Sequence, residues 1–337
     1  MRAWSARSGS TVACMTSHIP IATPYSALST ADDVLRGVDL SGLRVIVTGG
    51  SSGIGVETAR ALTAAGAHVT LAVRNTAAGE AVADVIERST GTLRPRVAHL
   101  DLADVRTVAK FVEDWVGPLH VLINNAGLVT SGMERTREGW ELQFATNHLG
   151  HFALAVGLRD ALALGASERD GARIVALSST AHMRSGVDFG DLHFQQRPYD
   201  PQIAYAQSKT ANSFFAVEAT RLWADDGIVA NAVNPGGVAT GLQRNFSLQQ
   251  KESLDAAEAA GVFSYKTIEQ GAATTIVAAV APEFARTGGH YLDDGHEAYT
   301  VANDVQLAQH PHGVKEWALD PVAATRLWAV SAELLRA

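Results

Sequence analysis

Short apolar runs rich in valine and isoleucine recur along this chain and are separated by stretches of helix length. Runs with so little polar alternation are typical of strands that are buried on both faces of a parallel sheet. Because crossovers between parallel strands are right-handed, we predict an α/β fold of one domain, a Rossmann-type doubly wound parallel sheet with helices on both faces. The predicted strands are Val45–Val47, Ala67–Val73, Arg96–Leu100, Val121–Ile123, Ile174–Leu177 and Ile228–Val233.

The composition restricts the partners of the chain. Its 337 residues are 47% hydrophobic and carry a net charge of −8. Since no basic run offsets that charge, nucleic acid and anionic membrane surfaces are excluded as main partners. Apolar runs such as Ile276–Ala281 are too short to span a bilayer, and a cytoplasmic protein is expected. Cys14 is the only cysteine, which leaves neither a disulfide nor a thiolate metal cluster.

The first forty residues differ from the rest of the chain. No acidic residue precedes Asp32, and serine, threonine and alanine are abundant there. This composition favours disorder over a targeting peptide. We therefore predict a flexible N-terminal extension over residues 1–40, followed by the domain at 41–337.

Glycine and polar residues directly follow each predicted strand. Parallel strands present their carboxyl ends at one edge of the sheet, where ligands of such folds bind. These segments therefore predict one ligand site. They are the glycine turn at 48–55, Arg74, Asp101-Leu102, Asn124–Gly127, Ser178-Ser179 and Asn234–Gly236.

The glycine turn is predicted to hold the pyrophosphate of a dinucleotide. Glycine removes Cβ atoms where the backbone must approach the phosphates, and the following helix directs free N–H groups at them. A tight strand–helix turn without a ligand would also use glycine, so the turn gains weight from its companion motifs. Its expected cofactor contacts are Gly49, Ser51, Ser52, Gly53 and Ile54.

The tip of the second strand indicates which dinucleotide is bound. An acidic residue there commonly accepts the ribose hydroxyls of NAD, whereas this chain has Arg74. A guanidinium can pair with a 2′-phosphate, which favours NADP(H) over NAD(H), although a solvated arginine is the alternative. Asp101 and Leu102 are expected at the adenine, with a helix N-cap as the alternative role for Asp101.

Tyr205 and Lys209 lie four residues apart, which places the phenol and the ammonium on one face of a helix. Such a pair is ordinarily a surface pair, but here it follows a glycine turn. Together these features predict hydride transfer from nicotinamide coupled to proton transfer by the phenol. The histidines of the C-terminal part show no ligand spacing with carboxylates, and no metal is predicted. They include His290, His296, His310 and His312.

The ordered motifs resemble the short-chain dehydrogenase/reductase family, in its single-domain branch. The matching residues are Thr-Gly-x-x-x-Gly-Ile-Gly at 48–55, Asn-Asn-Ala-Gly at 124–127, Asn147, Ser179, Tyr-x-x-x-Lys at 205–209 and Asn-Pro-Gly at 234–236. Segments 144–152 and 178–182, together with the insert at 183–204, resemble the retinol-dehydrogenase-like subgroup.

The resemblance implies a role for each matching residue. Tyr205 would transfer the proton, and Lys209 would stabilise the phenolate and hold the nicotinamide ribose. Ser179 would orient the substrate oxygen, Ser178 would face the packing, and Asn147 would order a water in a proton relay. Further expected cofactor contacts are Asn125, Ala126, Gly127, Pro235, Gly236, Val238 and Thr240, with Asn125 alternatively locking strands together.

The segment after the Asn-Pro-Gly turn is expected to form a substrate lid at about 237–266, and a tail begins at about 291. Apolar residues in the lid would suit a lipophilic small molecule. They are Leu242, Phe246, Leu248 and Phe263. His182 either lines that pocket or is structural, and residues 321–335 are predicted as a terminal helix.

The resulting hypothesis is an NADP(H)-dependent oxidoreductase that interconverts a ketone or aldehyde and an alcohol, with a small-molecule substrate. The alternatives are an NAD-linked dehydrogenase of a sterol-like or retinoid-like alcohol and a non-catalytic nucleotide-binding sensor. The resemblance also implies a homodimer formed through the helices around Asn147 and Tyr205, unless the tail caps that surface.

Overall fold

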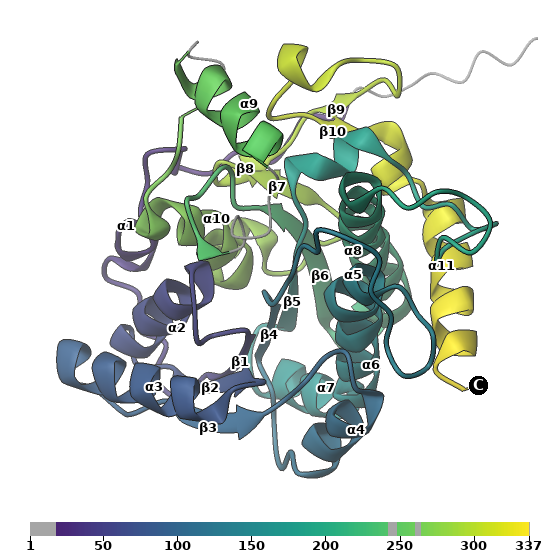
Figure 1. Ribbon diagram of the computed structural model, residues 1–337. Helices are drawn as coiled ribbons and strands as arrows, with labels where there is room; N and C mark the ends of the chain where they lie inside the picture. Colours follow the sequence, from purple (N-terminus) through teal and green to yellow (C-terminus); the bar gives the residue numbers. More distant parts are fainter. Residues whose placement is uncertain (1–17, 242–247, 260–263, 337) are drawn as a thin grey trace, which may run out of the picture.

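A central sheet of eight strands organises the protein (Figure 1). The computed structural model describes residues 18–241, 248–259 and 264–336. Strand order is β3-β2-β1-β4-β5-β6-β7-β8, with β1 to β7 parallel and β8 antiparallel to β7. This order confirms the doubly wound α/β fold. The strands are β1 Arg44–Thr48, β2 His68–Val73, β3 Arg96–His99, β4 Val121–Asn124, β5 Ala172–Leu177, β6 Ile228–Asn234, β7 Tyr291–Asp293 and β8 His296–Glu297.

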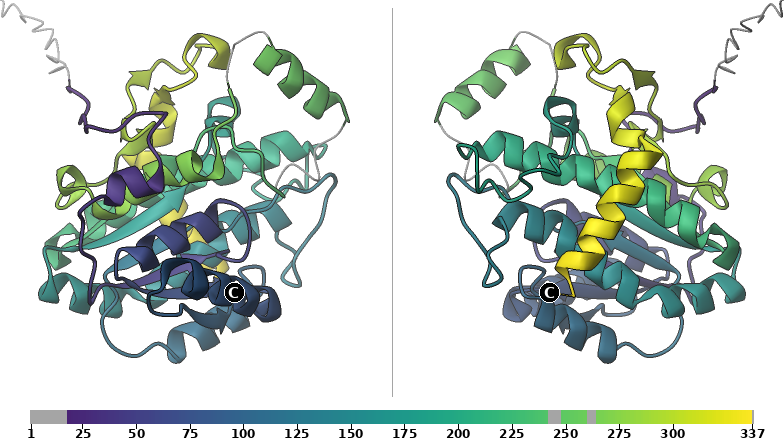
Figure 2. Two further views of the ribbon diagram at one scale, coloured as in Figure 1. Left: turned by 90° about the vertical axis from the view of Figure 1, so that its left-hand side faces the viewer. Right: turned by 90° about the vertical axis from the view of Figure 1, so that its right-hand side faces the viewer.

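Helices cover both faces of this sheet (Figures 1 and 2). One face packs against α1 (Ala31–Leu35), α2 (Ile54–Ala64), α3 (Thr76–Thr90) and α10 (Ile268–Val280). The other face packs against α4 (Val105–Glu113), α6 (Gly150–Gly157), α7 (Arg159–Glu168) and α8 (Pro201–Trp223). Since apolar side chains of each strand alternate between the two layers, both faces need a helical cover.

The N-terminal segment corrects part of the expected flexible extension. Residues 1–17 lie outside the described part, but residues 18–40 pack on the domain. The Ile21 backbone makes two hydrogen bonds with Glu297: its carbonyl accepts the Glu297 N–H, and its N–H donates to the Glu297 carboxylate. Thr30 then caps α1, and Val34 is 2% exposed. Composition missed these contacts because their partners lie far along the chain.

The C-terminal tail begins inside the sheet, which the sequence analysis did not predict. Residue Tyr291 opens β7, and the two short strands β9 (Thr300–Val301) and β10 (Val314–Lys315) follow. The predicted terminal helix is α11, Pro321–Leu334. It packs against α8, which it crosses in the right-hand view of Figure 2.

Part of the expected lid is described as α9, Leu248–Ala259. Leu242, Phe246 and Phe263 lie outside the described residues. The described side chains of α9 include the exposed Lys251, Glu252 and Asp255. This helix therefore presents polar groups to solvent in addition to any apolar cover that the lid supplies.

Over the described residues, no single helix combines the length and apolar character needed to cross a membrane. Residues 142–157 and 159–168 meet that test only as a pair, with a bend of 59° between them.

Candidate active site

A cavity of about 300 Å³ opens at the carboxyl ends of β1, β4 and β5. The segments that line it come from the glycine turn, the Asn-Asn-Ala-Gly segment, α8 and the turn after β6. Those that the sequence predicted are Gly49, Ser52, Gly53, Ile54, Asn125, Ala126, Gly127, Tyr205, Lys209 and Thr240. Residues for which it predicted no cofactor contact are Gly55, Leu128, Val129, Leu177, Ser178 and Gly241.

The glycine turn leaves the backbone open to a ligand at the start of α2. Gly53 has φ +58° and precedes the helix without a side-chain cap. A Cβ at Gly55 would lie 2.5 Å from Asn125 Nδ2 and 2.7 Å from the Gly49 carbonyl oxygen. The close packing explains these glycines, and the uncapped N-terminus leaves N–H groups for an anion.

Asn125 locks two strands together, as one of its two expected roles requires. Its Nδ2 donates to the Thr48 carbonyl at 2.7 Å, and its backbone N–H donates to Thr48 Oγ1 at 2.9 Å. The Ala126 N–H reaches the same hydroxyl at 2.9 Å. Thr48 therefore fixes the turn after β4 against the glycine turn, so both approach the cavity together.

Arg74 lies at the tip of β2, outside the cavity lining. Its side chain is exposed and makes no hydrogen bond or ion pair with any described residue. The next residue, Asn75, caps α3 by accepting the Ala78 N–H at 3.1 Å. The Arg74 guanidinium thus lies at the carboxyl edge of the sheet, directly before the capped helix α3. It can bind an anion there.

Asp101 and Leu102 also lie outside the cavity lining. Asp101 Oδ1 accepts the Ala103 N–H at 3.0 Å in a turn, while Asp104 is the residue that caps α4. Leu102 is 6% exposed and packs in the core. Its backbone lies so close to α6 that a Cβ at Gly150 would be 2.3 Å from the Leu102 carbonyl oxygen. The Leu102 side chain is therefore structural in this arrangement.

The helix α8 brings Tyr205 and Lys209 into the cavity. It begins at Pro201 behind the cap Asp200, whose carboxylate accepts two backbone N–H groups. Lys209 is 4% exposed, and its Nζ donates to the Leu177 carbonyl at 2.8 Å. That nitrogen lies 5.6 Å from the centroid of the Tyr205 ring. The helical spacing thus produces the shared face that the sequence predicted.

Burial sets the protonation of both groups. It raises the pKa of Tyr205 to about 12, against an opposing hydrogen bond with Ser179, and it lowers the pKa of Lys209 to about 8. Tyr205 is half-buried because it lines the cavity, and its phenol is neutral at physiological pH. The Tyr205 side chain is therefore a proton donor at this point rather than a phenolate.

The two serines after β5 face different ways. Ser178 is 2% exposed, and its hydroxyl donates to the Lys209 carbonyl at 2.8 Å. Ser179 hydrogen-bonds with Tyr205, and its Oγ accepts the Ala181 N–H at 3.2 Å. Ser178 therefore supports the helix, as expected, although it also lines the cavity, whereas Ser179 lies just outside the lining and reaches the phenol.

Asn147 lies in η1 (Ala145–Leu149), a π-helical segment between α5 (Leu142–Phe144) and α6. Its Nδ2 donates to the Leu128 carbonyl at 3.1 Å and to Ser208 Oγ at 3.0 Å, and its Oδ1 accepts the Leu128 N–H at 2.9 Å. The side chain thus fixes the segment after β4. A Cβ at Gly127 would lie 3.5 Å from both Asn147 Oδ1 and Lys209 Nζ. The segment after β4 therefore packs against both of these side chains.

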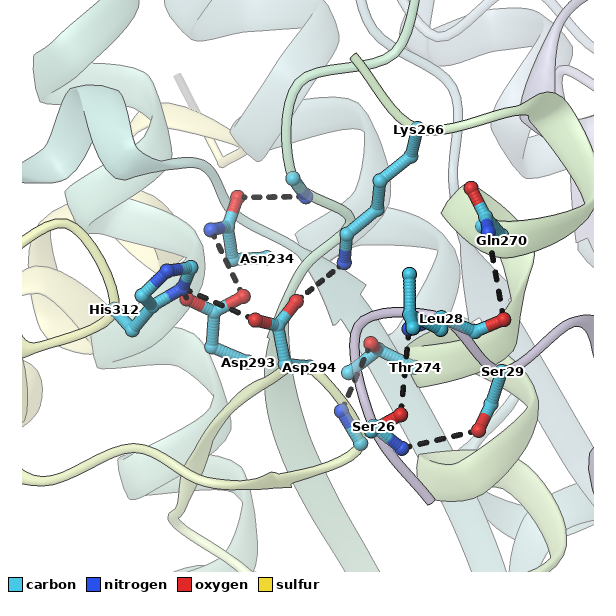
Figure 3. Close-up of polar contacts among 12 residues, drawn as sticks. Ser26, Leu28, Ser29, Asn234, Lys266, Gln270, Thr274, Asp293, Asp294 and His312 are labelled. Atoms are coloured by element: carbon cyan, nitrogen blue, oxygen red, sulfur yellow. Dashed lines mark hydrogen bonds and ion pairs between the residues drawn. The ribbon is translucent and has the colours of Figure 1, made fainter. Parts of the chain in front are cut away.

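The turn after β6 is held from below by the end of β7 (Figure 3). Asn234 Nδ2 donates to Asp293 Oδ1 at 3.2 Å, and its Oδ1 accepts the Gly236 N–H at 3.2 Å. Gly236 has φ +83°, and Lys266 packs over it, since a Cβ there would meet Lys266 Cε at 2.9 Å. Pro235 and Gly236 therefore shape the turn but do not line the cavity.

Thr240 and Val238, the last two expected cofactor residues after β6, lie beside the start of α2. A Cβ at Gly53 would lie 3.5 Å from Thr240, so the two sides of the cavity meet there. Val238 forms an isolated bridge with Lys266 and packs on Gly271 of α10. Ser51, like Val238, is outside the cavity lining.

Among the described residues, two groups of histidines and carboxylates come together in the fold although their spacing in the sequence gave no sign of it. Each group has potential ligand atoms within 4.8 Å of one another. Both are already joined by internal hydrogen bonds, and Lys266 pairs with Asp294 beside the second (Figure 3). The groups are His18, His290 and Glu297, and Asp293, Asp294 and His312.

A second hollow, of about 500 Å³, is larger than the candidate site but lies along the edge strand β3 and α4. Its charged residues Arg106 and Lys110 are paired with Asp104 and Asp114. None of the predicted catalytic residues lines it, so the smaller cavity is the better candidate.

Comparison with known proteins agrees with this geometry. Residues 44–251 match the family of short chain dehydrogenases. A probable oxidoreductase of Streptomyces lividans is 46% identical over 89% of this chain and 100% of its own length. The chloroplastic short-chain dehydrogenase TIC 32 B of Brassica napus is 36% identical over 92% and 94%.

Solved structures give the same result. An uncharacterized protein from Mycobacterium paratuberculosis has a TM-score of 0.68 at 30% identity, covering 91% of this chain and 97% of that one. A protein described as an NAD(P)-dependent gluconate 5-dehydrogenase from Beutenbergia cavernae, with bound NADP, has a TM-score of 0.61 at 26% identity, covering 76% and 97%. With its glycine turn, its Asn-Asn-Ala-Gly segment and its Tyr205–Lys209 pair at one cavity, and with relatives along nearly its whole length, the chain belongs to the short-chain dehydrogenase family and is an oxidoreductase.

Proposed function

We propose that this protein is an NADP(H)-dependent oxidoreductase that interconverts a ketone or aldehyde and the corresponding alcohol. One observation carries the proposal: Tyr205 and Lys209 line the same cavity as the glycine turn. A dinucleotide held by that turn would extend along the carboxyl edge of the sheet toward the phenol. The cavity thus combines a nucleotide cradle with a proton donor.

The residues present fit a nicotinamide dinucleotide. The uncapped start of α2 and Gly53 suit the pyrophosphate, and Thr240 lies beside them. Lys209 donates one N–H to the Leu177 carbonyl, and its other N–H groups can donate to ribose hydroxyls. A bound reduced nicotinamide would supply hydride to the carbonyl carbon.

Tyr205, Ser179 and Lys209 would carry out the proton transfer. Tyr205, neutral because burial raises its pKa to about 12, donates its proton to the substrate oxygen as that oxygen gains charge. Ser179, hydrogen-bonded with Tyr205, orients the same oxygen. Lys209 lies one helical turn away and offers a positive charge to the phenolate that remains. A resting phenol suits reduction as the physiological direction.

Leu128, Val129 and Leu177 line the cavity beside the catalytic pair, which supports an uncharged, lipophilic substrate. We expect the highest kcat/KM for apolar ketones and aldehydes in a panel assayed by NADPH oxidation. A panel in which small charged substrates are preferred would contradict this substrate class.

Replacing Tyr205 with phenylalanine tests the proton transfer. Tyr205→Phe keeps the ring but removes the acid, so kcat should fall by about a hundredfold or more. Fluorescence titration should give an NADPH Kd within about twofold of the wild-type value, because the glycine turn is untouched. Unchanged turnover in this variant would refute the proposed role, and a wild-type protein that binds NADPH but turns over nothing would favour the sensor.

Replacing Arg74 tests the choice of cofactor. Since Arg74 is exposed and unpaired among the described residues, Arg74→Ala should leave stability unchanged and weaken NADPH binding by about tenfold. The kcat/KM with NADH should change little. Arg88, an exposed arginine at the far end of α3, provides the control variant Arg88→Ala. A variant that keeps its NADPH preference would favour the NAD-linked alternative.

A further inference from the structure

The buried imidazole of His182 lies directly beneath the catalytic turn. His182 belongs to η2 (Thr180–Arg184), three residues after Ser179, and is 0% exposed. It does not line the cavity. Of the two roles that the sequence left open, contact with substrate is therefore disfavoured, and its hydrogen bonds indicate what else it does.

Both ring nitrogens are hydrogen-bonded to the backbone. Nδ1 lies 2.7 Å from the Ser179 carbonyl oxygen, and the Lys315 N–H donates to Nε2 at 3.4 Å. A carbonyl can only accept and an amide N–H can only donate, so these partners select the neutral tautomer with hydrogen on Nδ1. Burial, which lowers the pKa of His182 to about 4, keeps the ring neutral at physiological pH.

Three distant segments meet at this ring. Ser179 follows β5, Lys315 lies in β10 of the C-terminal tail, and Tyr291 begins β7. The Tyr291 phenol lies 3.0 Å from Nδ1 and also hydrogen-bonds with Ser178. The imidazole therefore connects the turn of the catalytic serine to the sheet and to the tail.

The conformation of this turn determines where the Ser179 hydroxyl lies. Ser179 is extended, with φ −172° and ψ 157°, and its Oγ accepts the Ala181 N–H. A rotation of the peptide between Ser179 and Thr180 would move the carbonyl off His182 and would displace the Ala181 N–H that holds the Ser179 Oγ. The Nδ1–H bond opposes that rotation and adds to the His182 backbone N–H, which donates to the same carbonyl at 3.0 Å.

We propose that His182 is a positioning residue that holds the Ser179 carbonyl, and through it the Ser179 hydroxyl, where it can meet both Tyr205 and a substrate oxygen, with β10 as its support. This inference rests on the proposed function. It makes the C-terminal tail part of the catalytic architecture, although none of its residues lines the cavity.

Two substitutions at His182 separate positioning from packing. Asparagine places an N–H close to the Nδ1 position, whereas glutamine places its amide closer to Nε2. His182→Asn should keep at least about half of the wild-type kcat, and His182→Gln should lose about tenfold or more in kcat. Binding of NADPH should stay within about twofold in both, because its contacts lie on the other side of the cavity.

A matched control is His120, 4% exposed, whose Nδ1 accepts the Arg44 N–H at 3.0 Å at the far end of the sheet. His120→Asn should lower the melting temperature without changing the kcat of the remaining folded protein. Equal kcat in the His182 asparagine and glutamine variants, or losses that track the melting temperature as in the control, would overturn the positioning role. A wild-type enzyme without NADPH-dependent carbonyl turnover would instead overturn the proposed function, and this inference with it.

Discussion

Tyr205 and Ser179 form the pair of residues on which the proposed proton transfer depends. Burial raises the pKa of Tyr205 to about 12, and the hydrogen bond with Ser179 acts in the opposite direction. The phenol is therefore the stable form over the physiological range, and the phenolate needed for alcohol oxidation forms only as pH rises. The serine thus affects chemistry as well as orientation.

Removing this hydrogen bond should shift the pH dependence of catalysis. In Ser179→Ala the pKa of Tyr205 should rise further, which displaces the alkaline rise of alcohol oxidation upward by about one pH unit. The kcat/KM should fall by about a hundredfold, since an oriented donor is lost. Rate profiles with NADP⁺ from pH 6 to pH 10 would measure both effects, because we expect the positive charge of bound NADP⁺ to lower the pKa of Tyr205 into this range. A profile with an unmoved alkaline rise would show that Ser179 does not act on the phenol.

At the scale of elements, the joint between β1 and α2 fixes how closely a ligand approaches the sheet. Thr48, at the end of β1, binds the backbone N–H groups of Asn125 and Ala126, and the glycines pack against the same turn. Side chains larger than hydrogen at these glycines would push the two turns apart. The cradle is therefore a packed joint between elements and not a free loop.

This packing predicts that one added methyl group will weaken cofactor binding. Gly55→Ala should weaken NADPH binding at least about tenfold and destabilise the fold by about 1–3 kcal/mol, because the new Cβ meets Asn125 and the Gly49 carbonyl. In Gly157→Ala the new Cβ would lie 2.7 Å from Val112, which gives a comparable clash far from the cavity. That control should lose stability but retain its NADPH Kd. Thermal melting and fluorescence titration distinguish the two.

The sequence predicted these elements because their signals are local. Valine runs, the glycine turn and the Tyr205–Lys209 spacing each lie within a few residues. The missed features each join residues that lie far apart in the sequence. They are the hydrogen bond of Ile21 with Glu297, the hydrogen bond of Lys315 with His182, and the pairing of β7 with β6. Three residues of β7 carry too little pattern to identify a strand, and side chains such as Leu102 could be assigned to the core only once Gly150 was placed beside them.

At the scale of the whole molecule, α11 covers the surface that the resemblance assigned to a second subunit. Trp328 packs on Phe152 of α6 and on Phe215 and Trp223 of α8, with ring centroids 4.8 to 5.9 Å apart. Ser331 hydrogen-bonds with His148 at 2.9 Å. The tail therefore packs on α6 and α8, helices through which the resemblance implied a homodimer. This is the arrangement expected if the tail caps that surface.

We expect the protein to be a monomer in solution, as measured by light scattering. Trp328→Ala should destabilise it by about 3 kcal/mol and expose an apolar face, so that larger species form with rising concentration. Trp317→Ala, at a partly buried tryptophan of the same tail, serves as the control. A wild-type mass of two chains would show that another surface makes the dimer.

The contact between residues 18–25 and Glu297 also governs when the protein can finish folding. Burial raises the pKa of Glu297, but hydrogen bonds from His290, the Ile21 N–H and His18 lower it to about 2, which makes the carboxylate a firm anchor. Glu297 leaves the ribosome long after residues 18–25, the segment that it holds in place. The beginning of the chain must therefore wait through most of translation before it can take its place.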